Sequence, residues 1–352
     1  MRANKIRFIL AALAVGLLVW GIACNLGAKA PVGGEIRIYN WKDYFAPNTL
    51  DDFASETGIR VSLDEFDAEQ AMLSVIESDP SRYDVIFASD LMIADMVDLR
   101  LLAELDRKDL PNLANIDPAF LDQSWDPGNK HSVPYTWGST GVVYSKKNIQ
   151  TSDRRWSLLW DPKLQGRVAL LNDPFVVLGL ALKSLGHPMN SKDPAQVQRA
   201  TDLLKSYKEH ITGFLEPTEI KEKMVSGELW AAQVYSGDAA AIMAENPDLE
   251  FFIPIEGSDL WIDSIAVTRS APNKRAAEMF LDYILRPKIQ AVISEYTGYA
   301  TPNKAALQQG LVAREVLDNG VSYPPRDRLE RWTQLDAQRR TLWNMAWAEI
   351  QK

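Results

Sequence analysis

Strand-like and helix-like segments alternate along the first part of this chain, and the alternation limits the folds open to it. Residues 35–41 (EIRIYNW), 59–66 (IRVSLDEF) and 83–89 (YDVIFAS) have the apolar and aromatic content of strands. Residues 47–58 and 68–78, which separate them, have the apolar spacing of helices. Parallel strands need such crossover helices, so this order predicts a mainly parallel sheet with helices on both faces.

A second unit of the same kind follows in the middle of the chain. Its expected elements are a strand at 166–173, helices at 174–186 and 195–210, a strand at 229–236 and a helix at 237–246. After it we expect a strand at 259–270, helices at 273–285 and 287–298, and two more helices in the tail. A long helix is also expected at 90–105. The pattern predicts two α/β lobes.

The first residues are a separate segment. Three positive charges precede an apolar run of sixteen residues that ends before Cys24, which predicts an export signal over residues 1–24 and a tether over 25–34. An uncleaved anchor is the alternative. Cys24, the single cysteine, resembles the acylated cysteine of a bacterial lipoprotein, although Trp20 and Gly21 depart from that pattern. Cleavage after Ala23 fits about as well.

Charge and cysteine content narrow the functions. Removal of residues 1–24 takes away three positive charges and no acids, which moves the formal net charge from −9 to −12. An acidic body argues against a nucleic-acid partner and mildly favours a cationic one. The exported body has no cysteine, hence no disulfide and no thiol chemistry. We expect a periplasmic protein or one on the outer face of the cytoplasmic membrane.

Aromatic and acidic side chains recur where the expected strands end. Ligands of open parallel sheets bind beyond the carboxyl ends of the strands. The residues at these ends in the two units are Trp41, Asp43, Tyr44, Ser89, Asp90, Asp173, Tyr235 and Asp238. Each also has a structural interpretation: Ser89, Asp90, Asp173 and Asp238 could cap helices, and Trp41 or Tyr44 could belong to the core.

Asp263 is harder to explain, because it lies inside the strand-like segment 259–270. A buried carboxylate costs several kcal/mol unless a positive group meets it. A structural lysine or arginine is one candidate for that group. Trp261 lies two residues earlier and therefore points to the same face. Aromatic faces and carboxylates together would form a box for a flexible organic cation.

Catalytic interpretations are weak. His131, His187 and His210 are scattered without metal-ligand spacing, and no hydrolase, Walker A or dinucleotide signature follows a strand. We therefore expect no enzyme activity, no cofactor and no metal. A carbohydrate enzyme that uses Trp41, Trp137 and Trp261 as sugar platforms is the remaining enzymatic alternative.

Several motifs, in order, resemble one known family. They are YNWKDYFAPNTLDDFASETGIRV, YDVIFASD, SVPYTWGSTGVVYS, LLND, YSGDAAA, WIDSIAV and GYATPNKAA. From about Glu35 to the C-terminus the chain looks like the substrate-binding proteins of bacterial polyamine (spermidine/putrescine) ABC importers. The resemblance implies a two-lobed periplasmic-binding-protein fold of type II, with the ligand cleft between the lobes.

The resemblance also implies how the chain is divided. Lobe 1 would comprise residues 35–138 plus 264–310, and lobe 2 residues 139–263. A C-terminal helical tail, 311–352, would pack on both lobes. The strands WGSTGVVYS and WIDSIAV would cross between the lobes, which places Asp263 at the floor of the cleft.

Site residues follow from the resemblance, position by position. The positions that match ligand contacts in the family are Trp41, Asp43, Tyr44, Ser89, Asp173, Tyr235, Asp238, Trp261, Asp263 and Tyr299. Departures concern the substrate: Val176 stands where the family often has a glutamate, and Leu91 where spermidine binders have a tyrosine. The family also has a ligand contact in the tail, and it corresponds to one of the three residues 332–334.

The function implied is that of an exported, monomeric subunit that captures putrescine or spermidine. Its partners would be an inner-membrane ABC permease and the ATPase of that permease, with membrane contact only through a lipid anchor on Cys24. Two alternatives stay open: a polyamine sensor that acts on a membrane receptor, and a binder of another organic cation.

Overall fold

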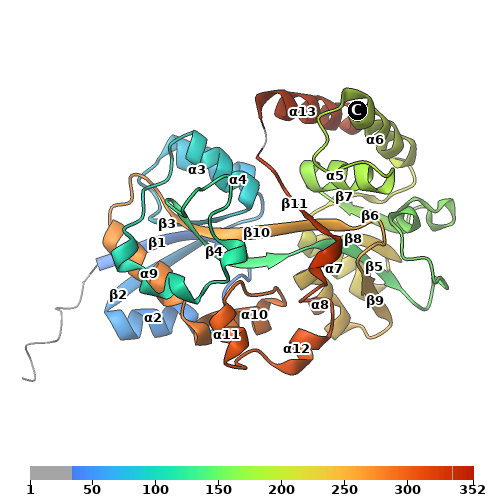
Figure 1. Ribbon diagram of the computed structural model, residues 1–352. Coiled ribbons are helices and arrows are strands. Elements are labelled where there is room, and N and C mark those ends of the chain that lie inside the picture. Colours follow the sequence, from blue (N-terminus) through green and yellow to red (C-terminus); the bar gives the residue numbers. More distant parts are fainter. Residues whose placement is uncertain (1–33, 335) are drawn as a thin grey trace, which may run out of the picture.

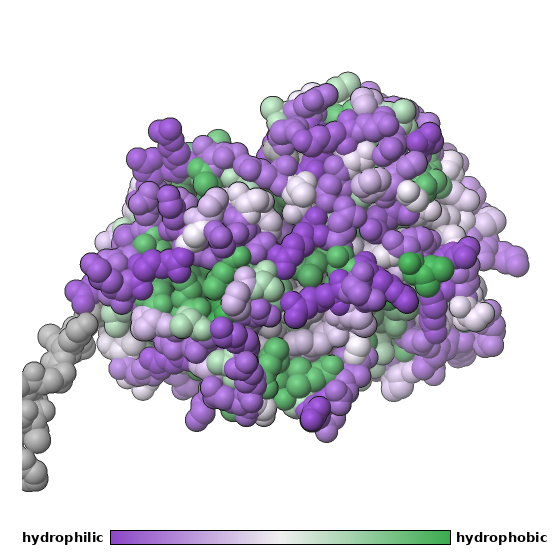
Figure 2. All heavy atoms as spheres, viewed as in Figure 1, coloured by the Kyte–Doolittle hydropathy of each residue, from purple (hydrophilic) through white to green (hydrophobic). Residues whose placement is uncertain are grey.

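The computed structural model describes residues 34–334 and 336–352, which form two α/β lobes joined by crossing strands (Figure 1). The expected signal, Cys24 and the tether up to residue 33 lie outside the described residues. Hydrophilic residues cover much of both lobes on the face shown in Figure 2, and the outline is notched between the lobes at the top. In the part of the chain that is described, no helix is long and apolar enough to cross a membrane.

The first sheet carries the strands from the N-terminal part of the chain. Its order is β2-β1-β3-β10, and β4 and β11 both pair with β10. Strand β1 is parallel to β2 and β3, whereas β10 is antiparallel to β3 and β4. The strand bounds are β1 Gly34–Trp41, β2 Ile59–Phe66, β3 Val85–Ala88, β4 Ser132–Gly138, β10 Ser258–Val267 and β11 Leu329–Arg331. The helices of this lobe are α2 Thr49–Thr57, α3 Glu69–Ser78, α4 Asp90–Asp98 and α9 Lys274–Ile284.

The second sheet has the order β7-β6-β8-β5-β9. Strand β6 is parallel to β7 and β8, and β5 is antiparallel to β8 and β9. The strand bounds are β5 Thr140–Ser145, β6 Val168–Leu171, β7 Gly213–Leu215, β8 Ala231–Tyr235 and β9 Leu249–Phe252. The helices around it are α5 Pro174–Ser184, α6 Pro194–Tyr207, α7 Pro217–Ser226 and α8 Ser236–Glu245.

Two connections carry the chain between the sheets. Strand β4 leads through Ser139 directly into β5. Strand β10 returns: its first residues pair with β11, its middle pairs with β4, and Ser264–Val267 pair with β3. The lobe boundaries expected at 138/139 and 263/264 fall in these two connections. That the two lobes move relative to each other at these boundaries stays a prediction.

The C-terminal part of the chain extends along both lobes (Figure 1). Helices α10 (Pro287–Thr297), α11 (Lys304–Gln308) and α12 (Arg314–Asp318) come first, and the last helix, α13 (Ala337–Gln351), packs on α5 and α6. Between them β11 pairs in parallel with the start of β10. The two helices expected in the tail correspond to α12 and α13, and β11 is an additional strand that the sequence did not predict.

Two expectations need correction. The helix expected at 90–105 ends at Asp98, because Arg100 adopts a left-handed conformation (φ 57°) and Leu102 then bridges to Thr268 beyond β10. The sheets are also less parallel than predicted, because the crossing strands β5 and β10 run antiparallel to most of their neighbours. The α/β class itself, with two sheets, is confirmed.

Candidate ligand-binding site

Asp263 lies on β10 where this strand passes between the two sheets. Its side chain is 9% exposed and accepts a hydrogen bond from the hydroxyl of Tyr44. The same hydroxyl lies 2.7 Å from the hydroxyl of Thr136, the residue opposite Asp263 on β4. Burial raises the pKa of Asp263 to about 7, against the lowering effect of the Tyr44 hydrogen bond.

Among the residues that the structure describes, no lysine or arginine forms an ion pair with this carboxylate. The ion pairs among residues 34–334 and 336–352 leave Asp263 out. The structural ion pair considered from the sequence is therefore absent from the described residues. A buried carboxylate with a single hydroxyl donor is costly when it is charged, and a cation from outside the chain would remove that cost.

Five aromatic rings form one continuous series across the two lobes, and it includes Tyr44, whose hydroxyl donates to Asp263. The ring centroids of Trp41 and Tyr44 are 5.3 Å apart, and those of Tyr44 and Tyr299 are 5.8 Å apart. Tyr299 lies 5.1 Å from Trp261, which lies 6.0 Å from Tyr235. All four contacts are edge-to-face, with interplanar angles between 72° and 83°. We call these five residues the aromatic series.

Two glycines leave room for the central rings of this series. A Cβ on Gly138 would lie 2.3 Å from the indole of Trp261, and a Cβ on Gly237 would lie 2.4 Å from the ring of Tyr299. Side chains at either position would force the rings away from Asp263. The indole N–H of Trp261 is buried and has no hydrogen-bond partner among the described residues.

Asp173 combines a cap with a contact to the aromatic series. One of its oxygens accepts hydrogen bonds from the backbone N–H groups of Phe175 and Val176, both at 3.0 Å, which caps α5. The other accepts from the hydroxyl of Tyr235 at 3.0 Å. Burial raises the pKa of Asp173, and these hydrogen bonds oppose the rise. Capping is therefore part of its role and not all of it.

Asp238 lies in the first turn of α8, whose N-cap is Tyr235, so the capping role considered for Asp238 is not observed. Its carboxylate interacts with Tyr299 of the aromatic series. Burial raises the pKa of Asp238 to about 6, while Tyr299 and the charge of Lys221 act in the opposite direction.

Ser89 leads to a residue that sequence reasoning missed. It caps α4 by accepting from the N–H of Met92, as considered from the sequence. Its own N–H and hydroxyl donate to the two oxygens of Glu69, at 2.6 and 2.8 Å. Burial raises the pKa of Glu69 to about 8, the Ser89 hydrogen bonds lower it, and the charges of Asp263 and Asp173 raise it further.

No side-chain contact among the described residues joins the side chains of the remaining positions to these groups; Val176 meets Asp173 only through its backbone N–H. Asp43 is exposed in a left-handed turn (φ 56°), and its side chain makes no hydrogen bond there. Val176 is buried in α5, and Leu91 is half-buried in α4. In the tail, the indole N–H of Trp332 donates to a carboxylate oxygen of Asp259, with a nitrogen–oxygen distance of 3.4 Å. The side-chain amide of Gln334 donates to Asp98 at 3.0 Å.

Four carboxylates thus share one kind of environment, and we call them the carboxylate cluster. They are Glu69, Asp173, Asp238 and Asp263. Each has a pKa raised by burial, and none forms an ion pair with a described residue. Together with the aromatic series they can hold a flexible organic cation. The described residues contain no grouping of three or more histidine, cysteine or acidic side chains that could hold a metal ion.

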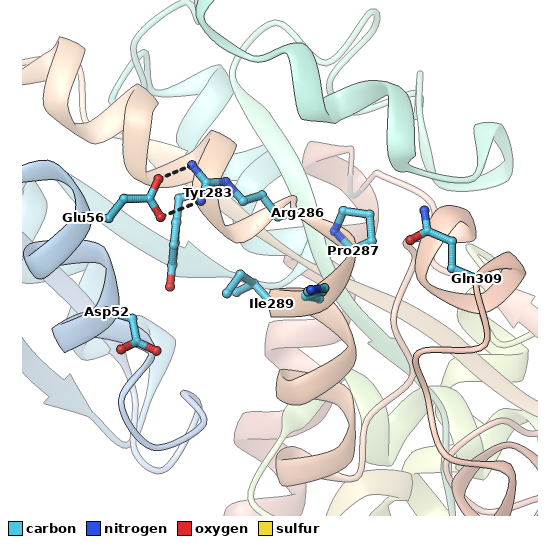
Figure 3. A pocket seen from close by; sticks show the side chains of 8 residues that line it. Asp52, Glu56, Tyr283, Arg286, Pro287, Ile289 and Gln309 are labelled. Carbon is cyan, nitrogen blue, oxygen red and sulfur yellow. Dashed lines mark hydrogen bonds and ion pairs between the residues drawn. The ribbon is translucent and has the colours of Figure 1, made fainter. Parts of the chain in front are cut away.

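A surface pocket of about 570 Å³ lies elsewhere on the first lobe (Figure 3). Its lining includes Glu56, Tyr283 and Arg286 and no member of the cluster or the aromatic series. Here the acid already has its cation, since Arg286 donates two 2.7 Å hydrogen bonds to Glu56. The ion pair lowers the pKa of Glu56, the reverse of what happens at Asp263.

The two sheets, the strands that cross between them and the acidic, aromatic site on a crossing strand define a two-lobed ligand-binding protein of the periplasmic type. The chain belongs to the bacterial extracellular solute-binding proteins, whose family model matches residues 48–317.

Relatives within this family have been named for their ligands. The chain is 29% identical over 320 residues to the spermidine/putrescine-binding periplasmic protein of Escherichia coli K12, an alignment that covers 90% of each chain. It is 30% identical over 339 residues to the putrescine/cadaverine-binding protein of Pseudomonas aeruginosa, covering 92% of this chain and 95% of that one. A putative spermidine/putrescine ABC transporter structure from Listeria monocytogenes matches with a TM-score of 0.84 and 35% identity, covering 90% of this chain and 98% of the other.

Proposed function

We propose that this chain captures a polyamine outside the cytoplasmic membrane of a bacterium and delivers it to an ABC permease and its ATPase. Membership of the extracellular solute-binding family supports the class, and the names of the similar proteins support the ligand. Binding is non-covalent, and the chain performs no catalysis. It acts as a monomer.

The observation that carries the ligand assignment is the state of Asp263. This carboxylate is buried in a strand, its pKa is raised to about 7, and its one hydrogen-bond donor among the described residues is a tyrosine hydroxyl. An ammonium group placed beside it would supply the missing positive charge and form a charge-assisted hydrogen bond. The bound cation would lower the pKa of Asp263 again.

The aromatic series suits the rest of such a ligand. Ring faces attract ammonium groups by about 0.5–2 kcal/mol each, and methylene groups can pack against the same rings. A polyamine alternates these two chemistries along one flexible chain. The further acids of the carboxylate cluster, Asp173, Asp238 and Glu69, are available to its other amines.

The preferred ligand in this proposal is a diamine such as putrescine, with spermidine as the next candidate. Val176 lacks the carboxylate that would hold one more amine from α5. A ligand that touches Asp263, Tyr44 and Tyr235 contacts both lobes, so its binding favours the closed arrangement of the lobes. The permease would recognise that closed form.

The N-terminal segment completes the proposal. The signal would be removed by cleavage after Ala23, and Cys24, then the first residue of the mature chain, would carry a lipid that holds the protein at the outer face of the membrane. Mass spectrometry of the mature protein tests this directly: a diacylglyceryl group on Cys24 supports the anchor, and a chain that starts unmodified after Ala23 contradicts it.

The ligand is tested by calorimetric titration of the body, residues 31–352, after unfolding and refolding to remove carried-over ligand. The panel is putrescine, cadaverine, spermidine, spermine, agmatine, glycine betaine and maltose, with Asp263→Asn as the matched control. Saturable binding of one or two polyamines, lost in the control, is the expected result. Binding of maltose or betaine alone, or no binding of any polyamine, would contradict the proposal.

A further inference from the structure

Glu69 is the first residue of α3, and its carboxylate is held in a fixed orientation. The N–H of Ser89 donates to one oxygen at 2.6 Å, and the hydroxyl of Ser89 donates to the other at 2.8 Å. The hydroxyl oxygen of Ser89 meanwhile lies 3.3 Å from the backbone nitrogen of Met92, which donates to it. Ser89 therefore uses its donors on Glu69, and its own role at the site is to position that carboxylate.

The register of the sheet places this carboxylate beside Asp263. Ala88 of β3 is paired with Ser264 of β10 in an antiparallel ladder, so the next positions outward are Ser89 and Asp263. Neighbouring strands are about 4.8 Å apart. Glu69, which is bonded to Ser89, thus lies at the strand end where Asp263 faces the second lobe.

The charge of Glu69 has no partner within the described chain. No ion pair formed by residues 34–334 and 336–352 includes it. The titratable groups that face it are also acidic: Asp263 of β10, Asp173 of α5 and Asp90 of α4. An independent sign of a missing ligand is the indole N–H of Trp261, which belongs to the same site, is 7% exposed and is unpartnered.

We propose that Glu69 is a specificity-determining residue that binds one ammonium group of the ligand from the first lobe, opposite Asp173 on the second lobe. This inference rests on the proposed polyamine function and names a residue that selects for it. With Asp263 and Glu69 on the first sheet and Asp173 opposite them on the second lobe, the site has carboxylates for at least two ammonium groups on one flexible chain. A cation held between Glu69 and Asp173 also links the two lobes.

Proton release gives this inference a signature of its own. The pKa of Glu69 is raised to about 8, so a large share of the carboxyl groups are protonated at pH 8 before ligand binds. An ammonium group beside it favours the charged form, and the proton leaves to the buffer. Asp263, with a pKa of about 7, and Asp238, with a pKa of about 6, contribute much less at that pH.

The test compares the wild-type body with Glu69→Gln and with Glu65→Gln, an exposed acid in the neighbouring strand as the matched control. Putrescine and spermidine are titrated by calorimetry at pH 8 in two buffers that differ in ionisation enthalpy. We expect Glu69→Gln to weaken the tighter polyamine by about 30-fold or more and to reduce proton release. Glu65→Gln should change neither quantity.

Other outcomes separate the claims. Wild-type protein that binds neither polyamine would overturn the proposed function itself. Polyamine binding that Glu69→Gln leaves within about threefold, or weakens without any change in proton release, would overturn the role of Glu69 and leave the function standing. If Glu69→Gln does not fold, Glu69→Asp replaces it. This variant keeps the charge at a shorter reach, so weaker binding with proton release retained supports the inference, and unchanged affinity contradicts it.

Discussion

Two aspartates on strand β10 differ in how the protein satisfies their charge. Asp259 is fully buried at the end of the strand in the second lobe, and it accepts hydrogen bonds from the backbone and the hydroxyl of Thr140, at 2.7 and 3.0 Å. The hydroxyl of Ser258 and the indole N–H of Trp332 lie at 3.1 and 3.4 Å. Asp263, four residues later, accepts a hydrogen bond from the Tyr44 hydroxyl and from no other residue of the described part of the chain.

Burial raises the pKa of both groups; four hydrogen-bonding groups oppose the rise at Asp259, whereas among the described residues the Tyr44 hydroxyl opposes it at Asp263. The ring of Tyr44 belongs to the aromatic series. Under the proposed function, this difference separates a structural carboxylate from one that is held for a partner from outside.

The largest expected effect is on ligand binding by Asp263→Asn. The amide keeps the shape but removes the charge that pairs with an ammonium group, so polyamine binding should become weaker by about 3–5 kcal/mol. The free energy of unfolding without ligand should not fall at pH 8, because no protein cation loses its partner. Calorimetry and urea denaturation measure the two quantities. Unchanged polyamine affinity together with a lower free energy of unfolding would mean that Asp263 is the structural carboxylate, which contradicts the proposed role.

Asp259→Asn should show the opposite behaviour. The amide group would face donors from Thr140 and Trp332, which leaves buried polar groups unpaired. We expect the free energy of unfolding to fall by about 2–4 kcal/mol, with polyamine affinity in the folded protein within about threefold of wild type. A variant as stable as wild type would mean that the four donors do not distinguish Asp259 from Asp263.

Two glycines allow the surroundings of Asp263 and Asp259 to be compared by changes in packing alone. A Cβ on Gly138 would lie 2.3 Å from the ring of Trp261 beside Asp263, and one on Gly179 would lie 2.5 Å from the ring of Trp332 beside Asp259. Each Gly→Ala change should lower stability by about 1–3 kcal/mol through overpacking. Gly138→Ala alone should also weaken polyamine binding. An equal loss of affinity in Gly179→Ala would show that the two ends are not independent.

The pH dependence of stability has a slope of at most about 1.4 kcal/mol per pH unit for each proton, and the effect accumulates over the pH range between the unfolded and folded pKa values. The pKa of Asp263 is about 7 in the folded protein, above the ordinary value of about 3.9, so the folded state binds a proton that the unfolded state does not. Stability without ligand should therefore rise as the pH falls from 8 towards 4, and polyamine affinity should fall below about pH 7. In Asp263→Asn the stability gain, measured by urea denaturation at pH 5 and 8, should be smaller. An equal gain in wild type and variant would remove Asp263 as a cause.

The sequence predicts most of the fold because its alternation of strands and helices is local. Residues 90–105 show the limit: their composition is helical throughout, yet the chain turns at Arg100 so that Leu102 can bridge to Thr268. Strand β11 is missed for the same reason, since three residues become a strand only through their partner β10.

The sequence likewise reveals some of the candidate site residues and misses others. Asp263 is conspicuous in the sequence because an acid interrupts an apolar strand, and the resemblance supplies the aromatic residues around it. Glu69 is not conspicuous, since acidic residues in the first turn of a helix are common and favourable. The observation behind its proposed role is its contact with Ser89, twenty positions away, which a sequence without its fold does not show. Asp43 lies between two aromatic residues in the sequence but is exposed in a turn.

The most direct test is a crystal structure of the ligand-stripped body with putrescine or spermidine bound. We expect an ammonium nitrogen about 2.8 Å from an oxygen of Asp263, with the methylene chain against Trp261 and Tyr299 and no ligand atom at Asp259. A polyamine bound away from Asp263, or a lysine or arginine of the chain moved in beside it, would contradict the claim that the ligand supplies the missing positive charge.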